Sequence, residues 1–175
     1  MLFKSHVPES NLEKRFRPAS EVFAFRQESD VYVAEIRADA ERAVELFARL
    51  VAEMPEVVAI SVECLRSGRE FTGAKLQLAE VRETIARLKV PLVAAGGVEI
   101  SVHTPDEQVA LSVMLDPWIF ARSDRWMYLL LGHGLEECAT LPGRGWTVGR
   151  HEFAGAPEVV NAVTMAAERL TLHAV

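Results

Sequence analysis

The residues with the widest chemical range gather late in the chain, in the stretch LGHGLEECATLPGRGW at residues 131–146. A nucleophilic thiol needs a histidine nearby and surroundings that lower its pKa. Cys138 is the thiol, and its possible basic partners are His103, His133 and His151. Two glutamates directly before Cys138 would raise the thiol pKa instead. His133, Cys138 and His151 are catalytic candidates by residue type alone, and we expect Cys138 to be a small apolar residue under a loop.

The same histidines, with Glu136 or Asp106, are ligand types that suit zinc. No two of them have the HxxxH or CxxC spacing that makes a zinc site predictable. The pair Gly96–Gly97 is followed by strand-like alternation, whereas a phosphate loop leads into a helix. The sequence therefore predicts no metal and no cofactor, and it predicts a bulge or sharp bend at the glycines.

Paired carboxylates are a further possibility, because general acid–base chemistry needs two acids that face each other in a cleft. Glu63, Glu99 and Asp116 lie on the expected outer faces of strands and can share a surface. We expect that surface to be the solvated face of a sheet.

Arginine and aromatic residues surround the late glycine-rich segment and are the types that dominate binding hot spots. The predicted binding residues are Arg122, Arg125, Trp126, Arg144, Trp146 and Arg150. Long glycine-rich loops with such side chains are often functional. The alternative is that the tryptophans fill the core and the arginines pair with neighbouring acids, since tryptophan is mostly buried.

Composition and charge limit the class of partner. The chain has 175 residues, of which 50% are hydrophobic and 25% charged, with a net charge of −6. Residues 1–20 hold four Lys or Arg against two Glu and have little periodicity, which predicts an N-terminal arm before a single domain at residues 21–175. An acidic body disfavours nucleic acid and favours a basic protein partner through electrostatic steering.

Nothing in the sequence resembles a targeting or membrane segment. The first residues contain no apolar signal-peptide core, and the longest apolar run, residues 90–98, is short and interrupted by proline and glycine. The two cysteines lie far apart, at Cys64 and Cys138. We therefore expect reduced thiols in a cytoplasmic protein that does not contact the membrane.

The first half of the chain alternates strands and helices. Residues 22–25 and 31–36 predict a hairpin of two strands. Asp39 is suited to begin a helix that ends at Pro55, with Glu45 and Arg49 as an outward pair. A strand at residues 57–65, a polar connector with two glycines and a helix at residues 76–89 follow.

The second half is dominated by period-two patterns. Residues 98–103 and 109–115 predict an antiparallel hairpin, and residues 118–122 a further strand. We interpret residues 125–131 as another strand, with the alternative of a short helix that Ser123 caps and Gly132 closes. Residues 132–156 are expected to be loop with a short strand at 146–148, and Pro157 to begin a terminal helix.

This order of elements predicts a two-layer α+β sandwich with about five to seven mostly antiparallel strands and two or three helices on one face. We infer a non-enzymatic protein-interaction module: an adaptor, an immunity-type inhibitor or a chaperone-like binder. The alternative is a small enzyme or ligand-binding domain with a pocket under residues 132–156. A homodimer through a sheet edge or through Trp118, Ile119 and Phe120 is a further expectation.

Overall fold

The computed structural model describes residues 21–142 and 155–175. These residues form a mixed α+β fold around one sheet with the strand order β8-β1-β2-β7-β6-β5-β3-β4-β9. Every neighbouring pair is antiparallel except β1 and β8. The α+β class and the mostly antiparallel sheet are confirmed, whereas nine strands exceed the predicted five to seven.

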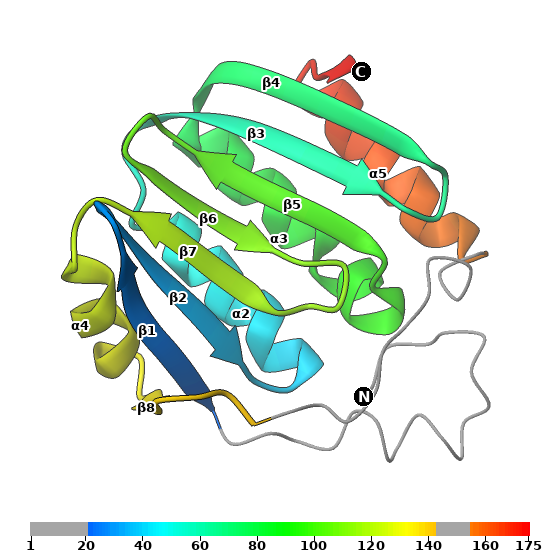
Figure 1. The fold of residues 1–175 in the computed structure, drawn as a ribbon. Helices are drawn as coiled ribbons and strands as arrows, with labels where there is room; N and C mark the ends of the chain where they lie inside the picture. Colours follow the sequence, from blue (N-terminus) through cyan, green and yellow to red (C-terminus); the bar gives the residue numbers. More distant parts are fainter. Residues whose placement is uncertain (1–20, 143–154) are drawn as a thin grey trace, which may run out of the picture.

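The bounds of the strands are β1 Val22–Glu28, β2 Val31–Arg37, β3 Val57–Cys64, β4 Arg69–Gln77, β5 Val98–His103, β6 Glu107–Leu111, β7 Pro117–Ala121, β8 Glu136–Glu137 and β9 His173–Ala174. The bounds of the described helices are α2 Ala40–Val51, α3 Leu78–Ala95, α4 Arg125–Gly132 and α5 Pro157–Arg169. Helices α2, α3 and α5 lie side by side behind the sheet, and α4 lies at its edge beside β1 (Figure 1).

The core fills the space between the sheet and helices α2, α3 and α5. Helix α2 begins where predicted, because the Asp39 side chain accepts a hydrogen bond from the backbone N–H of Arg42 at 2.9 Å. Its buried stripe includes Phe47, and the helix packs against β6 and β7, whose buried residues include Val109 and Ile119. The apolar residues that recur every second position on the strands and about every 3.6 positions on the helices thus pack together in one layer.

The polar connector expected after residue 65 and the helix expected from residue 76 were both wrong for residues 69–77. They form β4, which pairs with β3 from Cys64↔Arg69 to Val57↔Gln77 with a shift of register between Val58 and Ile60. Only Phe71 in this strand is a buried large side chain. The strand forms because β3 supplies backbone hydrogen-bond partners along its length. The hydrophobic pattern of residues 69–77 does not indicate those partners.

The interpretation of residues 125–131 as a strand was also wrong, and the helical alternative was right. Helix α4 buries Trp126 and Leu130, which are one turn apart. Ser123 lies at its start, where Oγ accepts from the Arg125 N–H at 3.2 Å. Periodicity does not separate helix from strand over so short an apolar run.

Helix α3 runs past its predicted end at residue 89, through Pro91, to Ala95. The Arg66 guanidinium caps the end of this helix: Nε donates to the Gly96 carbonyl at 3.0 Å and Nη2 donates to the Ala95 carbonyl. Gly96 and Gly97 then take φ values of 58° and 76°, which glycine adopts without strain. The predicted sharp bend is confirmed.

The outermost strands are very short. The dipeptide β8 pairs with Val22 and Phe23 of β1, and the dipeptide β9 pairs with Phe71 and Thr72 of β4. Short edge strands limit further pairing at a sheet edge. Nothing in the structure of the single chain tests dimerisation through an edge, which stays a prediction. None of the helices in residues 21–142 and 155–175 has the length and hydrophobicity to cross a membrane.

Candidate functional site

The structure places Cys138 and His133 beside the β1 edge of the sheet, where both take part in backbone hydrogen bonds. The Cys138 N–H donates to the Phe23 carbonyl at 2.9 Å, and its Sγ lies 3.4 Å from the same oxygen. His133 follows α4, and its carbonyl accepts from Arg42 at 2.9 Å. His151, the third catalytic candidate, lies outside the described residues. No group of three or more His, Cys, Asp and Glu in the described ranges is placed to hold a metal ion.

Trp126 and Arg125 form a compact cluster with Glu107. The Trp126 side chain is 0% exposed, and its Nε1–H donates to the Glu107 carboxylate at 3.0 Å. Arg125 donates to both oxygens of that carboxylate at 3.0 Å, and its guanidinium lies 4.6 Å from the Trp126 ring centroid. The geometry matches the alternative in which tryptophan is core and arginine pairs with a nearby acid. These contacts join α4 to β6.

Arg122 is the most exposed of the three described members of the predicted binding set. Its side chain is exposed and lies 3.4 Å from the Asp106 carboxylate, which is also exposed. Such a pair contributes little to stability, so both groups remain accessible to a partner. Arg144, Trp146 and Arg150 lie outside the described residues, as does the predicted strand at residues 146–148.

The face of the sheet opposite helices α2, α3 and α5 carries a second group of side chains. Side chains of strand β7 point alternately to the two faces of the sheet, and Ile119, which is 1% exposed, points into the core. Trp118 and Phe120 therefore lie on the opposite face, where their rings stack with centroids 6.0 Å apart and planes at 9°. Figure 1 looks onto this face, with the helices behind it. We call it the open face.

A hollow of about 550 Å³ lies on the open face over β5, β6 and β7. Its described lining consists of Glu99, Gln108, Ala110, Ser112, Trp118 and Phe120. Ala110 lies directly opposite Trp118 in the β6–β7 register, so a small side chain leaves space beside the indole ring. The hollow thus combines an aromatic wall with one carboxylate and neutral polar groups.

Carboxylates continue from this hollow across the sheet. Glu99 on β5 lies opposite Glu63 on β3, and Glu63 lies opposite Glu70 on β4. We call these three residues the glutamate row. Burial raises the pKa of Glu99 above its ordinary value, and the charge of Glu63 raises it further. The structure therefore places Glu63 and Glu99 side by side, as their expected outward positions on two strands allowed. Asp116, the third acid of that expectation, lies apart from them, 3.8 Å from Arg37.

The raised pKa of Glu99 predicts a pH dependence of stability. Between the ordinary glutamate pKa and the raised value, the folded protein holds this proton and the unfolded chain does not. The contribution of Glu99 to the free energy of unfolding therefore falls as pH rises through that window. We expect Glu99→Gln to stabilise the protein above the window and to have a smaller effect below it, measured by urea unfolding from pH 4 to pH 8. A pH-independent effect would contradict the raised pKa of Glu99.

The sequence contained a signal for Trp118 and Phe120, because period two around Ile119 places both on one face. The expected role was dimer contact rather than the wall of a hollow. Gln108 and Ser112 escaped notice because neutral polar residues on a strand face are ordinary. Only the β5-β6-β7 register brings them beside Glu99.

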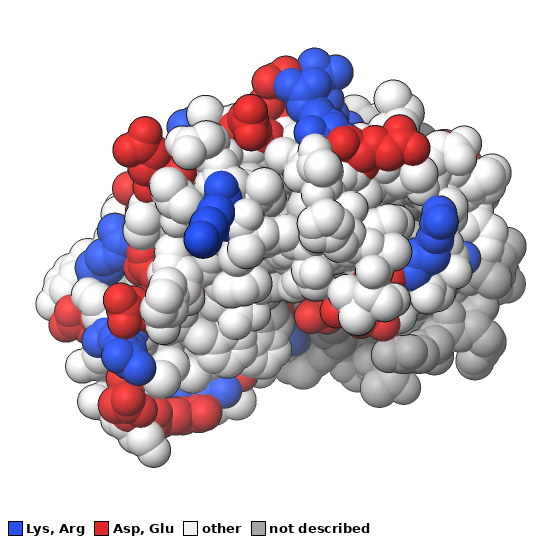
Figure 2. Space-filling view, turned by 90° about the horizontal axis from the view of Figure 1, so that it is seen from above, with Lys and Arg blue, Asp and Glu red and all other residues white. Residues whose placement is uncertain are grey.

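Charges on the side of the molecule that Figure 2 displays, at the β4 edge of the sheet, are mixed rather than segregated. Viewed from above the orientation of Figure 1, single blue side chains stand among red and white ones. Duplex nucleic acid needs several cations arranged along one track. The described residues form no continuous basic surface on this side.

The chain matched no protein-family model, and comparisons with curated proteins and with solved structures returned no match.

Proposed function

We propose that the protein is a non-enzymatic interaction module, an adaptor, whose open face binds a basic protein partner. The observation that carries the proposal is the hollow at Trp118 and Phe120, with Glu99 in its lining. Aromatic faces and a carboxylate together recognise the cationic head and apolar stem of lysine or arginine. The net charge of −6 favours encounter with such a partner.

The stacked rings and the glutamate row provide different parts of recognition. Trp118 and Phe120 are half-buried, so they are held in place yet keep contact with solvent. Rigid aromatic anchors bind at a small entropic cost. The glutamate row extends the acidic surface toward β4 and suits a partner with more than one basic residue. The free thiols of Cys64 and Cys138 agree with the cytoplasmic location in this proposal.

The direct test titrates the full chain with a peptide of alternating lysine and glycine while backbone amide shifts are followed by NMR. We expect the largest shifts in β5, β6 and β7. Trp118→Ala and Glu99→Gln should each weaken binding by about three- to ten-fold, the range of one cation–π or charge contact. Added salt should weaken binding further.

Glu56→Gln is the matched control, because Glu56 is an exposed acid outside the hollow. Glu56→Gln should leave the affinity within about two-fold of the parent, because solvent ions screen the attraction between a distant exposed charge and the peptide. Shifts that avoid the open face, or equal losses for Glu56→Gln and Glu99→Gln, would reject the proposal.

The sequence-based binding residues are tested in the same assay. If Arg144→Ala with Trp146→Ala abolishes binding at an unchanged melting temperature, while Trp118→Ala has no effect, the binding surface is the late segment. If Arg122→Ala weakens binding and Trp118→Ala does not, the binding surface is the turn after β7. Both outcomes keep a protein-binding role and reject the open face as its site.

A further inference from the structure

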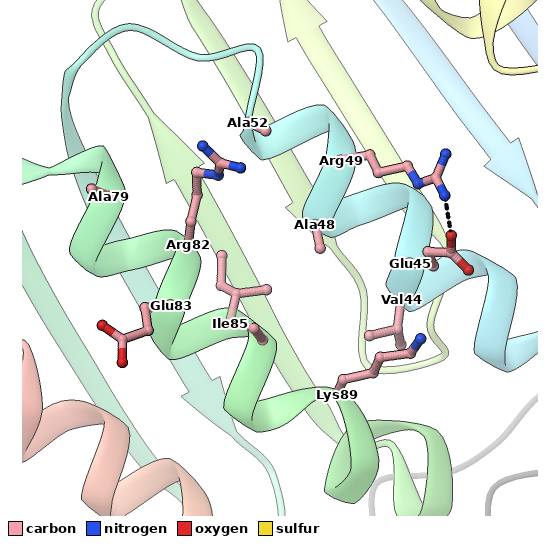
Figure 3. Close-up of a pocket in the computed structure, with 11 residues that line it drawn as sticks. Val44, Glu45, Ala48, Arg49, Ala52, Ala79, Arg82, Glu83, Ile85 and Lys89 are labelled. Carbon is pink, nitrogen blue, oxygen red and sulfur yellow. Dashed lines mark hydrogen bonds and ion pairs between the residues drawn. The ribbon is translucent and has the colours of Figure 1, made fainter.

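The helix layer carries a groove on the side of the molecule away from the open face. Helices α2 and α3 run antiparallel, and the groove lies between them (Figure 3). It has a volume of about 550 Å³. The lining residues are Val44, Glu45, Ala48, Arg49, Ala52, Ala79, Arg82, Glu83, Ile85, Ala86 and Lys89. Four of them are alanines, so a space that long side chains fill between most surface helices stays open.

Most charges at the groove already have partners within the chain. Arg49 pairs with Glu45 one turn before it, the dashed contact in Figure 3. Glu83 pairs with Arg87 at 2.9 Å and Arg169 at 2.6 Å. The hydrogen bond from Arg87 and the charge of Arg169 lower the pKa of Glu83, so it stays ionised and engaged.

Arg82 and Lys89 are the exceptions. The described residues make no ion pair or hydrogen bond with either side chain. Arg82 rises from α3 near Ala79 and Ala52, and Lys89 near Val44, so the two cations mark opposite ends of the groove (Figure 3). The two residues are seven positions apart on α3, which is about 10.5 Å along the axis at 1.5 Å per residue. The groove therefore has an apolar floor with one available positive charge at each end.

We propose that this groove binds an acidic amphipathic helix of a partner protein, with two carboxylates seven residues apart that pair with Arg82 and Lys89. Carboxylates at positions i and i+7 of a helix have the same axial spacing as the two cations. Alanines on the floor allow close approach of the partner's apolar stripe.

A helix fits this groove better than an extended peptide does. Helices α2 and α3 use their backbone groups internally, so an extended peptide between them would leave its N–H and C=O groups without partners. A helix satisfies its own backbone groups. Glu45 on α2 and Glu83 on α3, one on each side of the groove, would disfavour the regular phosphates of a nucleic acid (Figure 3). The groove and the open face lie on opposite sides of the sheet, so this protein can bridge an acidic and a basic partner.

The test uses site-specific photo-crosslinking in cells that express the protein naturally. A photoreactive side chain replaces Ala86 on the groove floor, and in a second version the exposed Ala74 on β4. Mass spectrometry of the adducts then identifies the crosslinked segment. We expect the Ala86 version alone to label a segment that forms a helix with acids at i and i+7.

Charge reversal decides whether the two cations carry the binding. Arg82→Glu with Lys89→Glu should lower the adduct yield by about ten-fold or more, because like charges then face each other. Replacing the two paired acids of the partner segment with lysine should restore the adduct yield of this charge-reversed variant. Lys75→Glu reverses another exposed cation and should have no effect.

Several outcomes overturn the proposal. They are the absence of an Ala86 adduct, labelling of a segment without the acid pair, and a yield that survives charge reversal in a variant with parental thermal stability. Trp118→Ala separates the two surfaces, because it should abolish binding at the open face and leave the Ala86 adduct unchanged.

Discussion

Replacing Phe47 with alanine should lower the free energy of unfolding by about 3–5 kcal/mol, the range measured for large aromatic truncations in protein cores. Phe47 is 0% exposed and lies on the buried stripe of α2. Truncation removes apolar contacts and leaves a cavity, because neighbours on the sheet and on α3 are held by their own backbones. Urea unfolding followed by circular dichroism measures the change.

Arg82→Ala provides the control for Phe47→Ala. Arg82 is exposed on α3 without an ion pair among the described residues, so its removal should change stability by less than about 0.5 kcal/mol. A loss below about 1 kcal/mol for Phe47→Ala would show that α2 does not present this face to the core. Because helix α2 also forms one wall of the α2–α3 groove, that result would remove the groove as well.

Replacing Trp126 should also destabilise the protein strongly. We expect Trp126→Ala to cost about 3–5 kcal/mol, because the indole is fully buried between α4 and the sheet. Trp126→Phe keeps a large ring but removes the Nε1–H donor to Glu107, whose side chain is 12% exposed. The phenylalanine variant should cost about 1–3 kcal/mol, the penalty for a buried polar group that loses a partner.

The Trp126 variants decide between a structural and a binding role. If this residue acts in binding, both variants weaken partner capture and leave the unfolding midpoint unchanged. If it is structural, both lower the midpoint, and Trp126→Phe combined with Glu107→Gln costs less than the sum of the single changes. We expect the structural result, with Arg125 coupled to the same cluster because it donates to both Glu107 oxygens.

The contrast between Arg125 and Arg122 shows what residue type alone does not decide. Both arginines lie within four positions of each other, next to an aromatic run. Arg125 stacks on Trp126 and binds the largely buried Glu107 carboxylate, and Arg122 faces solvent beside an exposed aspartate. The strand register of β6 decides this difference, because it places Glu107 under α4 and Asp106 at the turn.

The open face likewise shows that sequence patterns do not reveal which residues distant in the chain become neighbours. Alternation around Ile119 predicts that Trp118 and Phe120 share a face, and alternation in β3 and β5 predicts the outward side of Glu63 and Glu99. Which outward residues become neighbours depends on strand order. The order β7-β6-β5-β3 places the aromatic pair, Glu99 and Glu63 in sequence across the sheet, and loops of very different lengths produce that order.

The amino-acid sequence alone was enough to predict the elements with long, regular patterns: the β1–β2 hairpin, helix α2 from its Asp39 cap, the β5–β6 hairpin and helix α5 from Pro157. In each, local propensity, capping and apolar periodicity favour the same structure. Strand β4, helix α4 and the two dipeptide edge strands were decided by tertiary structure, because their stability comes from backbone partners and packing surfaces distant in the chain. The hollow at Trp118 and the α2–α3 groove belong to that second group, since each exists only where separate elements meet.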